Sequence, residues 1–151
     1  MSLFSWAARV YWEDTDGGGI VYYANYLRFL ERARTEWLRS LGHSQHELAR
    51  TTGILFAVSG LSVEYRRPAR LDDELTITCE PHRERATVLR FAQSIYRGTA
   101  GPTERPAKES PAGTADNLLV EADVRVVCVD ARTLKPKRLP DFLDALALER
   151  P

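Results

Sequence analysis

A helical stripe of apolar residues between Asn25 and Leu41 is the clearest periodic pattern in the chain. Apolar side chains recur there at spacings of three and four residues, which places them on one face of a helix. The stripe consists of Tyr26, Leu30, Ala33, Trp37 and Leu41. We therefore expect a long amphipathic helix over 25–41, with Asn25 as its N-cap and Gly42 just beyond its end.

Alternation of apolar and polar residues predicts five strands around this helix. The expected strands are 4–12, 54–66, 74–80, 86–97 and 118–130. The last of them alternates most regularly, which is typical of a strand with one buried face. In the second, one face is expected to carry Leu55, Ala57, Leu61, Val63 and Tyr65.

Two shorter helices are also expected. Ser44 and Glu47 form a capping-box pattern that predicts a helix ending at Gly53, and residues 140–148 have the composition of a short terminal helix. A long helix followed by strands with short connections indicates an α+β fold in which the helix packs on an antiparallel sheet. At 151 residues, we expect a single domain spanning 1–151.

The segment 98–117 interrupts this pattern. It holds three prolines and three glycines, and its other apolar residues are all alanines. Such a composition buries too little surface to offset the entropy of ordering it, so we expect a mobile loop between two strands.

Composition narrows the class of protein. The formal net charge is zero, from 21 basic and 21 acidic residues, so nothing favours a nucleic-acid or membrane-surface partner. No signal peptide is recognisable, and no apolar run approaches the ~20 residues of a membrane span. Cys79 and Cys128 lie in strand-like runs without a C-x-x-C motif, which favours buried thiols and a cytoplasmic location.

The segment 11–26 contains the strongest candidate chemistry. Glu13, Asp14 and Asp16 end a strand-like run, three glycines follow, and the long helix then begins. A helix start carries unpaired N–H groups and about +0.5 elementary charge. A carboxylate beside such donors suits attack on a carbonyl whose oxygen becomes negative. A solvated acidic turn has the same composition, so the spacing alone leaves both interpretations open.

Three long motifs resemble a known family. They are V-Y-W-E-D-T-D-G-G-G-I-V-Y-Y-A-N-Y-L-R-F-L-E-R-A-R-T-E-W-L, V-E-Y-R-R-P-A-R-L-D-D-E-L and E-A-D-V-R-V-V-C-V-D-x-x-T-L-K-P-K-R-L-P. Together they resemble the hotdog-fold acyl-CoA thioesterases, most closely the YbgC-like branch associated with the Tol-Pal cell-envelope system. They are also similar to 4-hydroxybenzoyl-CoA thioesterase. The resemblance covers nearly the whole chain except 98–117.

The resemblance implies a hotdog fold, in which a curved antiparallel sheet wraps around the long helix. It implies an acyl-CoA thioesterase without a metal or redox cofactor, forming a homodimer or tetramer with active sites between subunits. The family's catalytic aspartate falls on Asp16, its carbonyl-polarising N–H on Tyr23, and its preceding glycine on Gly19. YbgC-like proteins usually carry histidine where this chain has Tyr23, which bears on the choice of acyl group.

Further residues are candidates for substrate binding. Tyr22 and Tyr26 would suit an aromatic acyl group or the core, and Glu31 is a reserve catalytic acid or half of a helical ion pair with Arg28 or Arg34. Two basic clusters suit the phosphates of CoA, although basic residues at strand ends are often simply solvated. They comprise Arg66, Arg67 and Arg70 in one, and Lys135, Lys137 and Arg138 in the other.

Two other functions are compatible with the fold that is implied. One is a non-catalytic partner that binds acyl-CoA or acyl carrier protein in a cell-envelope (Tol-Pal) or phospholipid-synthesis complex. The other is a hotdog dehydratase, which would need a histidine in the acidic bend. None of His43, His46 and His82 lies there, and we expect no metal site from them.

Overall fold

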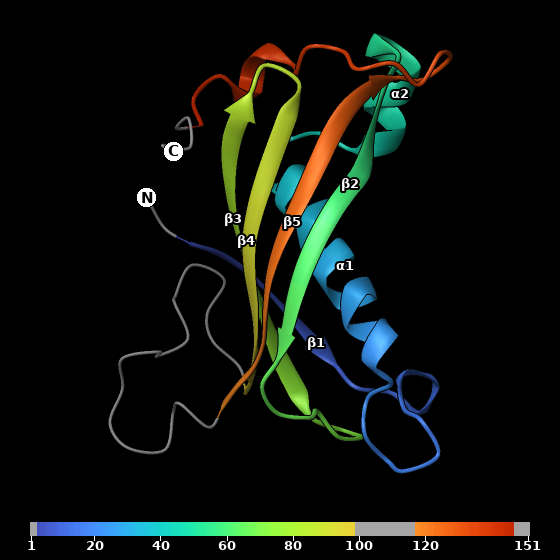
Figure 1. Cartoon of the computed structure of the whole chain (residues 1–151), viewed down its shortest axis with the longest axis vertical. Coiled ribbons are helices and arrows are strands. Elements are labelled where there is room, and N and C mark those ends of the chain that lie inside the picture. The colour runs from blue at the N-terminus through green and yellow to red at the C-terminus, as the bar shows by residue number, and fades with distance from the viewer. Residues whose placement is uncertain (1–2, 99–116, 147–151) are drawn as a thin grey trace.

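A curved antiparallel sheet lies along one long helix in the computed structural model, which describes residues 3–98 and 117–146 (Figure 1). The α+β architecture is therefore confirmed. The helices are α1 (Tyr26–Ser40) and α2 (Gln45–Thr52), and the strands are β1 (Phe4–Arg9), β2 (Ile54–Tyr65), β3 (Glu74–Arg85), β4 (Val88–Arg97) and β5 (Leu118–Asp130). The same ranges also contain the 3₁₀ turns η1 (Trp12–Asp14), η2 (Tyr23–Asn25) and η4 (Asp141–Leu143).

The sheet has the order β1-β3-β4-β5-β2, and all neighbouring strands are antiparallel. The first two strands in the sequence thus lie at opposite edges, with α1 crossing between them (Figure 1). Strand β2 runs for 12 residues and has β5 as its only partner within the described chain. It therefore leaves one backbone edge open for pairing with another strand.

Two hydrophobic clusters fill the space between α1 and the sheet. Phe29, Leu30, Ile77 and Ile95 are central to the cluster at the start of the helix. The cluster at its end is built around Trp37, Phe91 and Leu89, and Leu143 of η4 closes it. The amphipathic stripe predicted for the helix is the surface that is buried, apart from Leu41, which is exposed.

A β-bulge in β2 overturns the single face predicted for that strand. The register shifts between Val58 and Gly60, so the residues before and after the bulge swap sides. Leu61, Val63 and Tyr65 face the helix side because they pair with Val124, Ala122 and Val120, whereas Leu55 and Ala57 lie on the opposite face. Phe56 and Val58 take the helix-facing positions before the bulge.

Three of the four residues predicted to cap or end the two helices act as expected. Gly42 and Gly53 have φ values of 90° and 69°, which suit glycine at a helix end, and the Ser44 hydroxyl accepts from the Glu47 N–H at 3.1 Å. Asn25 occupies the predicted N-cap position, but it has helical backbone angles and its side chain donates to the Asp14 carbonyl instead of accepting from a helix N–H.

Other helix and strand ends differ from the prediction for local reasons. The first strand ends at Arg9 rather than residue 12, because 12–14 form η1, and β3 continues beyond residue 80 to Arg85. The predicted tail helix 140–148 is a single 3₁₀ turn over Asp141–Leu143 as far as the structure describes it. Of the predicted loop, 99–116 lies outside the described residues. No helix in the described ranges is both long enough and apolar enough to span a bilayer.

Candidate functional site

Asp16 sits in a tight turn between η1 and the start of the helix. Its N–H donates to the Ile20 carbonyl at 2.9 Å, and its carboxylate accepts from the Gly18 N–H at 2.7 Å. Gly19 has a φ of +81°, a conformation that favours glycine. The turn therefore fixes the direction of the Asp16 side chain, which is exposed in the single chain.

The first turn of the helical segment presents unpaired backbone donors. The Asn25 N–H closes η2 by donating to the Tyr22 carbonyl at 2.8 Å, and α1 continues directly from Tyr26. The N–H groups of Tyr23 and Ala24 have no acceptor within the described part of the chain. Such a pair carries the positive end of the helix dipole, so it suits a developing oxyanion. The sequence prediction named only Tyr23, although every helix start leaves more than one free N–H.

Asp14 joins the acidic bend to the helix start. Its carboxylate accepts from the Tyr11 N–H at 2.8 Å. Its carbonyl accepts from the Tyr22 N–H at 3.0 Å and from the Asn25 side-chain amide at 2.9 Å. Asp14 is buried, so these contacts are protected from water. They hold the turn that carries Asp16 against the turn that carries the free donors.

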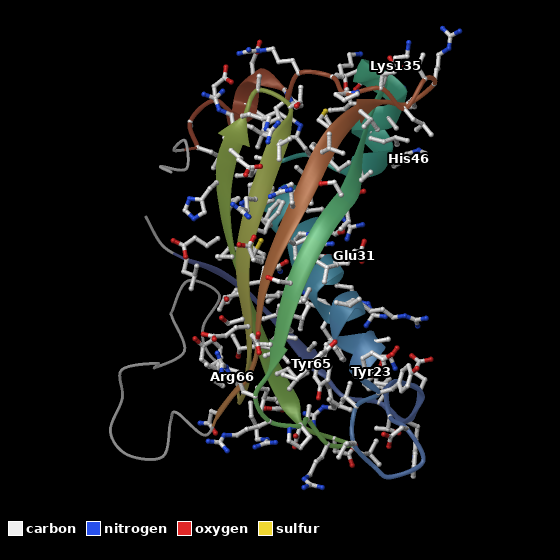
Figure 2. All side chains as sticks on the ribbon, in the orientation of Figure 1. Tyr23, Glu31, His46, Tyr65, Arg66 and Lys135 are labelled. Atoms are coloured by element: carbon white, nitrogen blue, oxygen red, sulfur yellow. The ribbon has the colours of Figure 1, made fainter. Side chains whose placement is uncertain are left out.

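The connection between β2 and β3 supports the other side of this segment. The Val21 N–H donates to the Ala69 carbonyl at 2.9 Å, and Ile20 forms a β-bridge with Arg70. The Tyr65 hydroxyl donates to the Tyr23 carbonyl at 3.0 Å. Figure 2 shows these two tyrosines at the end of the molecule where the glycine-rich loop lies. Sequence reasoning missed Tyr65, whose side the bulge determines.

The structure brings one predicted basic cluster to this end and not the other. Arg66, Arg67 and Arg70 are all exposed, but only Arg70 is joined to the Asp16 turn, through the bridge to Ile20, whereas Arg66 lies 2.9 Å from Glu121. The Lys137 amine instead donates to the Thr52 carbonyl at the end of α2, and Arg138 lies 3.7 Å from Asp144. Lys135, in the same cluster, is at the opposite end from Tyr23 (Figure 2).

The remaining candidates differ in exposure. Tyr22 and Tyr23 are exposed, with ring centroids 5.0 Å apart. Tyr26 is buried, which raises the pKa of its phenol, and its oxygen accepts from the Ala69 N–H. Glu31 is exposed and accepts from the Thr35 hydroxyl at 3.2 Å. The ion pair expected between Glu31 and Arg28 or Arg34 does not form in the described structure.

Nothing in the described residues resembles a metal centre: no three His, Cys, Asp or Glu side chains gather in a way that could hold an ion. Cys79 and Cys128 are buried free thiols. Burial raises the pKa of both, which makes them poor nucleophiles.

Comparison with known proteins gives a consistent family. The model of the thioesterase-like superfamily matches residues 10–146. The acyl-CoA thioester hydrolase YbgC of Escherichia coli O6:H1 is 45% identical over 144 residues, which is 95% of each chain. The acyl-CoA thioesterase YbgC of Haemophilus influenzae is 38% identical, over 94% of this chain and 92% of its own.

Solved structures confirm the predicted hotdog fold. The probable thioesterase from Bartonella henselae superposes with a TM-score of 0.71 at 30% identity. The match covers 93% of this chain and 100% of that one.

Proposed function

Because the chain belongs to the thioesterase-like superfamily, we propose that it hydrolyses acyl-CoA thioesters to the free acid and CoA. Asp16 is the proposed nucleophile or general base, and the Tyr23 N–H polarises the carbonyl. The main support for this assignment comes from the hydrogen bonds of Asp14 to Tyr11, Tyr22 and Asn25, which we call the Asp14 clamp. They tie the Asp16 turn to the turn with the unpaired donors.

Two routes are compatible with a carboxylate in this position. As a base, Asp16 takes a proton from water, the hydroxide adds to the carbonyl carbon, and the carbon–sulfur bond then breaks to release the CoA thiolate. As a nucleophile, an Asp16 oxygen displaces the thiolate to form a mixed anhydride, which water hydrolyses. In both routes the carbonyl oxygen becomes negative and is stabilised by the Tyr23 N–H. One such donor is typically worth about 10²–10³ in rate.

The surroundings of this site suggest how CoA is held. Arg70 is a cation bridged to the Asp16 turn, and Arg66 and Arg67 are exposed cations of the same connection, so the three are the proposed partners of the CoA phosphates. Gly19 allows the turn, and Tyr22 and Tyr23 offer aromatic surface for the acyl group.

We also propose that the protein forms a homodimer. The open edge of β2 is long, and Leu55 on it is an exposed apolar residue. Pairing with a second copy would satisfy this edge and enclose Asp16, which is open to solvent in the single chain. Lys137 and Arg138 can serve the Asp16 site only from such a second copy, given their place at the opposite end.

The Asp16→Asn variant tests the assignment. Amide replacement removes both basicity and nucleophilicity while keeping the shape, so turnover should fall by at least about 10²-fold with an unchanged circular dichroism spectrum. Glu13→Gln is the matched control, since Glu13 is an exposed acid in the same bend. It should keep the parent rate.

Activity would be measured by thiol release from short, long and aromatic acyl-CoAs. Parent-level hydrolysis by Asp16→Asn would show that Asp16 is misassigned. If the parent hydrolyses no thioester but binds an acyl carrier protein, the result supports the alternative of a non-catalytic binding partner. A single turnover in ¹⁸O-water separates the two routes, because label in the aspartate appears only through the anhydride.

A further inference from the structure

A small hollow opens between α1 and the sheet, about three turns along the helix from the Tyr23 N–H. It is lined by Arg34, Trp37, Leu38, Gln45, Phe56 and Phe91, among others. Its cavity volume is about 40 Å³, which is enough for a group of a few atoms but not for a whole acyl chain. The lining is largely apolar, and Arg34 is its one cation.

Arg34 is partly buried and makes few contacts with polar groups of the described chain. One nitrogen donates to the Gln93 oxygen at 3.0 Å, and the group lies 6.0 Å from the centre of the Phe91 ring. No carboxylate of the described chain comes within 4 Å of it. Burial lowers the pKa of Arg34, and nearby Glu31 only partly opposes this. A guanidinium has five N–H donors, so several remain for a ligand that enters the hollow.

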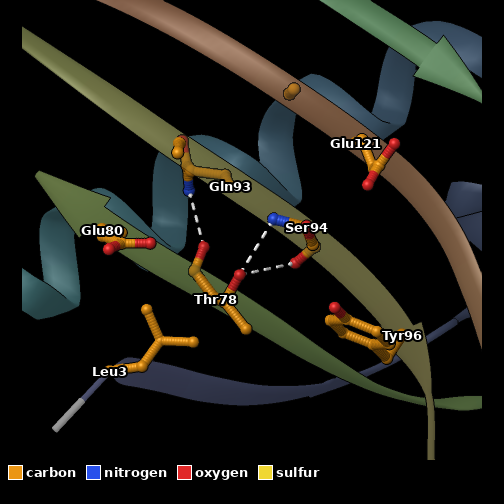
Figure 3. A pocket seen from close by; sticks show the side chains of 9 residues that line it. Leu3, Thr78, Glu80, Gln93, Ser94, Tyr96 and Glu121 are labelled. Carbon is orange, nitrogen blue, oxygen red and sulfur yellow. Dashed lines mark hydrogen bonds between the residues drawn. The ribbon is translucent and has the colours of Figure 1, made fainter. Parts of the chain in front are cut away.

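Gln93 fixes Arg34 in this position. Gln93 is only 2% exposed, and its amide nitrogen donates to the Leu30 carbonyl at 3.0 Å and to the Thr78 carbonyl at 3.3 Å. Figure 3 shows the bond to Thr78. Because both amide hydrogens are engaged, the Gln93 oxygen must face Arg34. The arginine is thus held on one side by a fixed neutral acceptor, and it also lines the hollow.

An apolar strip connects the hollow with the Asp16 end of the molecule. Val58, Leu61 and Tyr65 face the helix side of β2 and are 48%, 46% and 46% exposed. The strip begins beside Phe56 in the hollow and ends where the Tyr65 hydroxyl meets the Tyr23 carbonyl. Apolar surface of this kind suits an alkyl chain lying between the two ends.

We propose that Arg34 binds a carboxylate at the far end of the acyl group, so that the preferred substrates are CoA thioesters of dicarboxylic acids. The inference rests on the proposed thioesterase function and adds the substrate class. Tyr23 and Arg34 are about 16 Å apart along the helix axis, and the arginine side chain leans back toward the helix start by several ångströms. The remaining ~10 Å corresponds to about eight carbon–carbon bonds.

The test compares length-matched substrates. Adipoyl-, suberoyl- and sebacoyl-CoA are assayed against hexanoyl-, octanoyl- and decanoyl-CoA, with Arg34→Met as the variant. Loss of a charge-assisted contact predicts a fall in kcat/KM of about tenfold to a hundredfold for the best dicarboxylic substrate. The alkyl substrate of the same length should keep its rate. Arg39→Met is the matched control, since Arg39 is exposed on the same helix and pairs with Glu36.

Other outcomes are equally informative. If Arg34→Met lowers both substrate series alike, or if the parent shows no preference for the carboxylated series, the inference is wrong. Should Arg34→Met not fold, Arg34→Lys keeps the charge but loses the planar fork, and it should lose rate only with the dicarboxylic series. Calorimetric titration with suberate and octanoate gives a readout without turnover. If no thioester is hydrolysed, the proposed function fails, while selective suberate binding lost in Arg34→Met would still support the Arg34 site.

Discussion

Alanine substitutions at the three successive glycines separate the chemistry of the Asp16 turn from its stability. A Cβ added at Gly17 would meet no atom within 4 Å. A Cβ at Gly18 would lie 3.2 Å from Oδ1 of Asp16, which is closer than ordinary van der Waals contact. A Cβ at Gly19 has space, but the backbone there has a φ of +81°. The three positions thus differ in what alanine would disturb.

The expected magnitudes follow from these differences. Gly17→Ala should leave both kcat and the melting temperature near the parent values. Gly18→Ala must move the Asp16 carboxylate by a few tenths of an ångström, and since a 1 Å error costs about 10²-fold, kcat should fall about twofold to tenfold. In Gly19→Ala, an alanine would have to adopt the left-handed backbone conformation, which costs about 1–2 kcal/mol of stability. This should lower the melting temperature by about 2–8 °C for a chain of this length.

Thiol release from one well-hydrolysed acyl-CoA, together with thermal unfolding followed by circular dichroism, measures both quantities. The reasoning requires that Gly18→Ala reduce kcat more than Gly17→Ala while unfolding at a similar temperature. Equal activity of the Gly17 and Gly18 variants, with neither one destabilised, would mean that the direction of the Asp16 carboxylate does not matter. Asp16 would then not be the reacting group.

Two further predictions concern residues outside the glycine turn. Tyr65→Phe removes the hydrogen bond to the Tyr23 carbonyl, so it should cost at most about 0.5–1.5 kcal/mol of stability. It should lower kcat more than it raises KM, and an effect on KM alone would contradict a positioning role for Tyr65. Asp130 accepts from the N–H groups of Thr133 and Arg132, which lowers its pKa in the folded state. Its contribution to the stability of the fold is therefore present above its ordinary pKa and is lost as pH falls through the folded value. Asp130→Asn should therefore flatten the fall in melting temperature between about pH 5 and pH 2, and an unchanged acid profile would refute this.

The parts of the fold that were predicted correctly are those that depend on neighbouring residues. The period of the α1 stripe, and the glycines at 42 and 53, are properties of a few consecutive positions. The bulge in β2 was missed although a signal was present, because an isolated glycine within a strand, here Gly60, often marks one. Asn25 stands at the predicted N-cap position without capping the helix, because its side chain donates to the Asp14 carbonyl, an acceptor that only the folded turn provides.

The candidate site likewise has one part that a single sequence segment indicates and another part that depends on distant segments. The Asp16 turn, the Asp14 clamp and the free donors all lie within one run of 16 residues, 11–26, so a motif in the sequence can identify them together. Tyr65 on β2 and Gln93 on β4 come from separate segments, and only the folded sheet brings them near Tyr23 and Arg34. No local pattern connects them, and the sequence therefore indicated a reaction more readily than a substrate.

This division has a consequence for how the protein can change. The contacts that orient Asp16 involve backbone groups, namely the Gly18 N–H, the Asp14 carbonyl and the Ala69 carbonyl, so they tolerate many side-chain substitutions nearby. The hollow depends on side chains alone, and a single change at Arg34 or Phe56 alters its charge or shape without touching those backbone contacts. Substitutions in the hollow should therefore redirect the choice of acyl group at little cost to turnover, whereas substitutions that disturb the backbone contacts of Asp16, such as Gly18→Ala, should lower turnover with every substrate alike.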